Sequence, residues 1–110
     1  MAIALAQAEV TATAAAASVT ASFASTPTSG NLLLAVGYRD QASGGSNNGT
    51  ITGWAKDESA LVQASRRWVS IHSKVAGASE SKDVTFSASG ATTCQLHIFE
   101  ISGIASGMLD

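Results

Sequence analysis

The sequence predicts an all-β fold, a single domain over residues 1–110 built as an antiparallel, jelly-roll-like β-sandwich of about eight short strands. Apolar and polar residues alternate with a period of two along most of the chain. Turn-forming segments rich in Gly, Ser, Asn and Asp separate these stretches at intervals of about 8–12 residues. No segment of about 10–15 residues shows a helical period, which argues against βαβ units.

The N-terminal segment, residues 2–24, is rich in alanine, the best helix former. Its larger residues nevertheless follow the strand period, because Ile3 and Leu5 alternate with alanine, and Val19 and Phe23 alternate with small polar residues. We therefore expect strands here, with residues 14–17 forming a loop or a short turn.

The remaining elements follow from turn chemistry. Residues 26–31 predict a turn, and the strand at 32–39 begins with a nearly continuous apolar run, which indicates a central position. Residues 41–49 predict a polar loop that ends in Asn48–Gly49. Further strands are expected at 50–54, 60–64, 66–76, 84–88 and 93–101, with a turn at 77–83 and a possible strand stub at Ile104.

Two strands indicate which of their faces points inward. Along 67–75 the odd-numbered residues include three β-branched side chains and predict the core face, so Trp68 and His72 are expected to point outward. Along 93–101 one face carries Cys94, Leu96 and Ile98 and predicts the core, whereas the other carries Gln95, His97 and Phe99.

Composition excludes several classes of function. Ala, Ser, Thr and Gly make up about half of the 110 residues, and only 13% are charged, against about 25% in an ordinary soluble domain. The six Lys and Arg residues form no cluster, so a nucleic-acid partner is not expected, and no apolar run is long enough to cross a membrane. No basic residue precedes Arg39 and Glu9 interrupts the apolar start, so we expect synthesis in the cytoplasm without a signal peptide.

Catalytic and metal-binding constellations are not expected either. A single Cys94 allows no internal disulfide, and in a strand Cys94 and His97 point to opposite faces, so these two and His72 do not predict a metal site. There is no G-x-S-x-G elbow, and the glycine-rich loop at 44–49 lacks the lysine of a phosphate loop. We therefore predict no enzyme, no catalytic residues and no cofactor.

The most distinctive predicted surface is the even-numbered row that contains Arg66, Trp68 and His72. It is interpreted as cross-strand packing, as a subunit interface or as a glycan contact, because Trp and Arg are favoured in all three settings. Trp54 is interpreted as a residue covering the core or as a stacking platform. The interface set is Ile3, Leu5, Arg66, Trp68, His72 and Phe99, and the alternative glycan set is Trp54, Trp68 and Asn48.

Several turn motifs together resemble a family of β-sandwich modules found in phage virion proteins and in large bacterial surface proteins. They are the P-x-x-G-N-L-L string within 26–34, T-G-W at 52–54, K-V-A-G-A-S-E at 74–80 and E-I-S-G-I at 100–104. The resemblance extends from about Val19 to Asp110. It departs from the family pattern at Ser73 and Ile101, where tyrosines are expected.

The resemblance implies a role in structure or attachment and brings no catalytic residues with it. We therefore expect a non-enzymatic structural protein of a bacteriophage particle, a capsid decoration protein or another head or tail component, whose partners are further copies of itself and other virion proteins. The N-terminal strand around Ile3 and Leu5 could add to the sheet edge of a neighbouring molecule. The alternative is a carbohydrate-binding or adhesion module that binds a cell-surface glycan.

Overall fold

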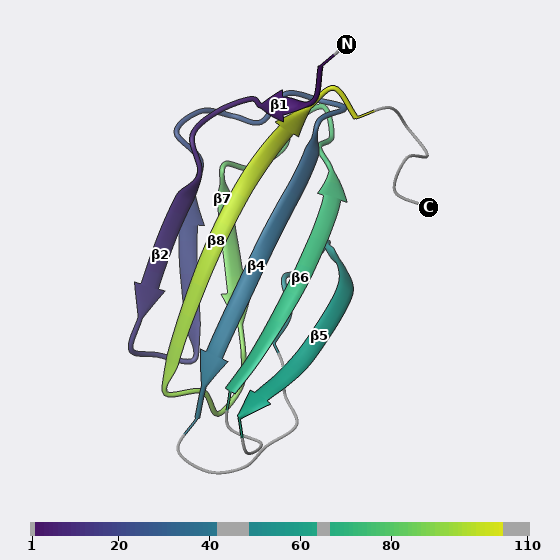
Figure 1. Cartoon of the computed structure of the whole chain (residues 1–110). Coiled ribbons are helices and arrows are strands. Elements are labelled where there is room, and N and C mark those ends of the chain that lie inside the picture. Colours follow the sequence, from purple (N-terminus) through teal and green to yellow (C-terminus); the bar gives the residue numbers. More distant parts are fainter. Residues whose placement is uncertain (1, 42–48, 64–66, 105–110) are drawn as a thin grey trace.

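A computed structural model describes residues 2–41, 49–63 and 67–104, and within these ranges the chain is all-β (Figure 1). Its strands form two antiparallel sheets packed as a sandwich, which confirms the predicted fold class. The finer jelly-roll arrangement stays a prediction. The strands are β1 (Ala4–Leu5), β2 (Val10–Ala14), β3 (Ser18–Ser22), β4 (Leu32–Asp40), β5 (Ala55–Gln63), β6 (Arg67–Val75), β7 (Asp83–Ser87) and β8 (Thr93–Ser102).

The larger sheet has the order β1-β8-β4-β6-β5, and β2 pairs with the same edge of β8 as β1 does. The last strand, β8, therefore lies between β4 and the N-terminal strands. The smaller sheet pairs β3 with β7, and an isolated bridge from Thr50 to Ser87 extends it. Figure 1 shows β3 and β7 behind the larger sheet, and no strand among the described residues lies in front of β8, β4 and β6.

The core fills the space between the two sheets and is built around Phe86. This side chain is fully buried and lies against Gly37 of β4, where a Cβ atom would come within 2.5 Å of the Phe86 ring. Because Gly37 has no side chain, the Phe86 ring can pack directly against the central strand β4. Small residues of this kind let the two sheets pack closely, so the core between them is thin but densely packed. The other large core side chains are Val19, Phe23, Leu33, Ile51, Val84, Leu96 and Ile98.

Most predicted strands are confirmed to within one residue at each end, but two differ further, and Ile104, expected as a possible strand stub, lies outside any strand. The expected strand at 50–54 is wrong beyond Thr50, because the chain turns at Gly53, which has a φ of +84°. The expected strand at 60–64 begins earlier, at Ala55. Its first part, Lys56–Asp57–Glu58, reads as a loop, yet charges and bulges are common on an edge strand because they discourage pairing with another molecule.

The predicted inward face of β8 is confirmed, but the predicted faces of β6 are reversed. Ser70 and His72 are 1% exposed and face the smaller sheet, whereas Ile71 and Val75 are 38% and 55% exposed on the opposite side. The register with β4 explains this, because His72 lies opposite Ala35, a fully buried residue of the core. In β6 the β-branched residues lie on the outer face and the polar Ser70 and His72 on the inner one, so alternation alone selects the wrong face.

Candidate functional site

The uncovered face of the larger sheet carries a continuous set of apolar side chains. Cross-strand neighbours point to the same side of a sheet, so the registers of β1, β4, β6 and β8 place these residues together. Only Leu32 is buried, and the rest are half-buried or exposed. We call this set the outer apolar face; it consists of Leu5, Leu32, Leu34, Val36, Tyr38, Val69, Ile71, Val75, Phe99 and Ile101.

Polar groups surround the outer apolar face. At one end Asp40 pairs with Arg67 at 3.5 Å between Oδ2 and Nε. Towards the β2 edge, Nδ1 of His97 lies 3.1 Å from the Thr11 hydroxyl and 3.9 Å from a Glu9 carboxylate oxygen. An apolar centre with a polar rim is the usual anatomy of a protein–protein interface.

Three members of the predicted interface set lie on this side of the molecule or at its edge. Leu5 is 56% exposed and lies opposite Ile101 in the β1–β8 ladder, and Ile3 immediately before β1 is 59% exposed. Phe99 is half-buried on the outer face of β8. These residues therefore gather where β1 pairs with β8.

Two other members lie inside the sandwich, so their predicted outward orientation is wrong. His72 is buried, and Trp68 is half-buried on the same inner face of β6. Trp68 lies opposite Arg39 in the β4–β6 ladder, with the guanidinium carbon 6.0 Å from the centre of the indole ring. The fully buried Arg39 side chain is stabilised by this cation–π contact and by a hydrogen bond that it donates to Gln41.

The predicted Arg66 and Asn48 lie outside the described residues. Trp54, the remaining member of the glycan set, is half-buried and packs against the core. The structure thus places Trp54 and Trp68 as packing residues rather than as rings that lie open on the surface.

Ser70 and His72 form a buried polar pair on the inner face of β6. The Ser70 hydroxyl oxygen lies 2.7 Å from His72 Nε2, the distance expected between a nucleophile and its general base. Burial, reinforced by Lys56 and opposed by Asp57, lowers the pKa of His72 to about 4. The neutral ring meets Phe86 edge-on at 5.7 Å between centroids, and with both residues 1% exposed the pair is a satisfied part of the core.

Glu100 joins three distant segments at one end of the sandwich. Its carboxylate is 2% exposed and accepts hydrogen bonds from the Thr28 backbone N–H at 2.8 Å, from Asn31 Nδ2 at 2.7 Å and from Gln7 Nε2. Burial alone raises the pKa of Glu100, but these three hydrogen bonds outweigh burial and hold the pKa below its ordinary value. Gln7 in turn pairs with the Ser25 backbone through both ends of its amide.

The contact between Asn31 and Glu100 gives two motifs of the resemblance a physical role. Asn31 belongs to the G-N-L-L turn and Glu100 opens the E-x-S-G strand end, and the fold brings them within hydrogen-bond distance. Gly103 of the second motif has a φ of +84°, and a Cβ atom there would lie 2.3 Å from the Ala2 carbonyl oxygen. Both motifs therefore close one end of the sandwich.

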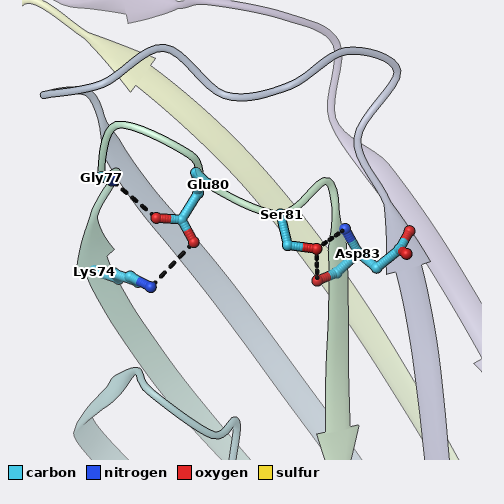
Figure 2. A network of polar contacts seen from close by, with 5 residues as sticks. All are labelled: Lys74, Gly77, Glu80, Ser81 and Asp83. Atoms are coloured by element: carbon cyan, nitrogen blue, oxygen red, sulfur yellow. Dashed lines mark hydrogen bonds and ion pairs between the residues drawn. The ribbon is translucent and has the colours of Figure 1, made fainter.

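Figure 2 shows that the third motif closes the turn between β6 and β7. The Glu80 carboxylate accepts a hydrogen bond from the Gly77 backbone N–H at 2.9 Å and forms an ion pair with Lys74 at 3.0 Å. Although burial raises the pKa of Glu80, these two contacts lower it overall. Next in the chain, the Ser81 hydroxyl accepts a hydrogen bond from the Asp83 N–H at 3.0 Å. Like the first two motifs, this one specifies the fold.

Within residues 2–41, 49–63 and 67–104 no group of three or more His, Cys, Asp or Glu side chains is arranged to hold a metal ion. Cys94 is buried; burial raises the pKa of its thiol, although Arg39 opposes the shift. The same part of the chain contains no helix long and apolar enough to cross a bilayer.

Sequence reasoning missed the outer apolar face as a whole, although one signal pointed to it. In the Leu-Leu-Leu-Ala-Val-Gly-Tyr run of β4 the residues that point to either face are apolar or glycine. This pattern is typical of strands that are covered on both faces. The run correctly predicts a central strand, and it equally indicates that the second face of this strand is covered. The comparisons add no relative, because no protein-family model matches the chain and no curated protein or solved structure matches it significantly.

Proposed function

We propose that the chain is a non-enzymatic structural protein of a bacteriophage particle, a capsid decoration protein or another head or tail component, and that it acts through protein–protein contacts in the virion. The observation that carries this proposal is the outer apolar face. Apolar surface of this extent on one side of a sheet, rimmed by polar residues, is typical of an interaction site.

The contacts that the motif residues make support the same proposal. The residues that resemble the module family stabilise turns and strand ends, so they specify a scaffold; they are Asn31, Glu100, Lys74 and Glu80. A scaffold that presents one uncovered face is suited to a role in assembly. The bacteriophage context rests on the resemblance, and the contact-making role rests on the face.

The test is a protein inventory of purified virus particles from cells that carry the coding sequence. We expect the chain to co-purify with the particles through a density gradient, at a constant ratio to the major shell protein. A chain that stays in the soluble fraction while intact particles sediment would contradict the proposal.

The carbohydrate-binding alternative stays a prediction with its own test. A glycan array that gives signals with the unaltered chain and loses them with Trp54→Ala would favour it over the structural role. We expect no glycan signal, because both Trp54 and Trp68 are engaged in packing.

A further inference from the structure

We infer that the outer apolar face packs against the same face of a second copy of this chain. The product is a two-fold symmetric dimer in which the two larger sheets lie back to back and the two smaller sheets lie outside. This inference rests on the proposed function, because it names the partner of the surface that carries it.

The first argument is that the two exteriors of the sandwich differ in chemistry. The outward side chains of the smaller sheet are all polar, and several bond one another: the Thr20 and Thr85 hydroxyls lie 2.7 Å apart, and Ser22 donates to Asp83 at 2.6 Å. That exterior is suited to water. The larger sheet carries Leu, Val, Ile, Tyr and Phe in the equivalent positions, and its central strand has the composition of a strand with protein on both sides.

The second argument is area. The larger sheet has five strand positions, and its β4, β5 and β6 are nine residues long. With strands about 4.8 Å apart and about 3.3 Å per residue, the flat area of this whole side of the sheet, the outer apolar face together with its polar rim, is roughly 700 Å². The strands β8, β4 and β6, which carry most of the outer apolar face, account for roughly 430 Å² of it. Side-chain relief makes the accessible area larger than the flat area, so centre and rim together approach the roughly 800 Å² that each partner contributes to a stable interface.

The third argument is charge, which favours a second copy over a charged partner. Among the described residues, the ten side chains of the outer apolar face carry no formal charge. Of the charges around it, Asp40 and Arg67 neutralise each other within one molecule, and Glu58 lies opposite Ile71 on the edge strand β5. An isologous interface places the same patch against itself, so an uncharged centre favours such an interface and a centre of one sign would disfavour it.

The experiment is sedimentation equilibrium over a dilution series of the full 110-residue chain, compared with three single variants. Ile71→Lys and Val75→Lys place a charge on the outer apolar face, where Ile71 and Val75 are already 38% and 55% exposed in the monomer. Ser18→Lys places the same charge on the exposed exterior of the smaller sheet and is the matched control. Circular dichroism and thermal unfolding of each variant check that it folds.

We expect the unaltered chain and Ser18→Lys to form dimers that dissociate on dilution. Because symmetry introduces each lysine twice, Ile71→Lys should weaken the dimer by roughly 100-fold or more, and Val75→Lys by a smaller factor. If Ile71→Lys fails to fold, Val75→Lys decides the question, since its side chain is mostly in solvent before association.

Two results would overturn the inference: a chain that is monomeric at its highest soluble concentration, and a dimer that both lysine variants form as well as the unaltered chain does. The first result would assign the face to another partner, and the second would assign dimerisation to another surface. Neither result depends on the particle inventory. A monomer that co-purifies with virions would contradict the dimer and leave the proposed function supported. A dimer that is absent from particles would support the dimer and contradict the proposed function.

Discussion

Replacing Glu100 with glutamine is expected to destabilise the fold strongly, because the buried Glu100 carboxylate accepts from three donors, two in the turn before β4 and one at Gln7. Hydrogen bonds to a charged acceptor contribute about 1.5–3 kcal/mol each, and a buried donor left without its acceptor costs about 1–3 kcal/mol. A glutamine amide keeps one acceptor oxygen and turns its NH2 group towards donors, so at least one of Thr28, Asn31 and Gln7 loses its bond. We expect a loss of about 2–4 kcal/mol in the free energy of unfolding.

The same group sets a direction for the pH dependence. Since the folded pKa of Glu100 lies below its ordinary value of 4.5, the unfolded chain takes up a proton at this side chain before the folded chain does. The stabilisation is therefore fully present above about pH 4.5 and is lost as the pH falls through the folded pKa. Glu100→Gln should remove this part of the acid sensitivity, because glutamine does not titrate.

Thermal unfolding followed by circular dichroism measures both effects, with Glu58→Gln on the exposed part of β5 as the matched control. For a chain of this length the expected loss corresponds to a fall of roughly 10–20 °C in Tm at neutral pH. The control should change stability by no more than about 0.5 kcal/mol, as is usual for surface substitutions. A Glu100→Gln variant as stable as Glu58→Gln would refute the conclusion that Glu100 stabilises the fold as a buried hydrogen-bond acceptor.

Two further predictions concern the core. Gly37→Ala forces a methyl group against the Phe86 ring and should lower the free energy of unfolding by about 1–3 kcal/mol. In the control Gly77→Ala no atom lies nearer than 3.8 Å to the new methyl group, so its stability should be unchanged or slightly higher. Equal effects of the two variants in urea unfolding would contradict the close approach of Phe86 to Gly37. His72 has a folded pKa of about 4 against an ordinary 6.5, so the unfolded chain protonates first and stability should fall between pH 6.5 and about 4. His72→Gln should flatten stability over this range, and an unchanged slope in His72→Gln would count against a buried neutral ring.

Local patterning predicted the sandwich because strand period and turn chemistry act within a few residues. The alanine-rich N-terminus forms strands as expected, since partners on β8 override the helix propensity of alanine. The early start of β5 at Ala55 was not predictable in this way, because Lys56 and the charges after it fit a loop as well as an exposed edge.

The candidate surface was predicted only in part, for a reason that lies in β6. Its β-branched residues suggested a core face, but which face is buried depends on the register with β4 and on the position of the smaller sheet, neither of which is a local property. Ser70 and His72 look like surface residues in the sequence and become core residues because they satisfy each other. Phe99 was placed correctly, since the alternation in β8 is unambiguous.

The position of β8 has a consequence for how the chain is made. Of the described strands β8 comes last in the chain, and β1, β2 and β4 all pair with it, so the N-terminal strands find their hydrogen-bond partner only when residues 93–102 have left the ribosome. Pairings between distant parts of a chain form slowly and leave strands exposed in the meantime. The larger sheet is therefore expected to form late in folding, and until β8 pairs, the open edges of β1, β2 and β4 are exposed to pairing with other molecules.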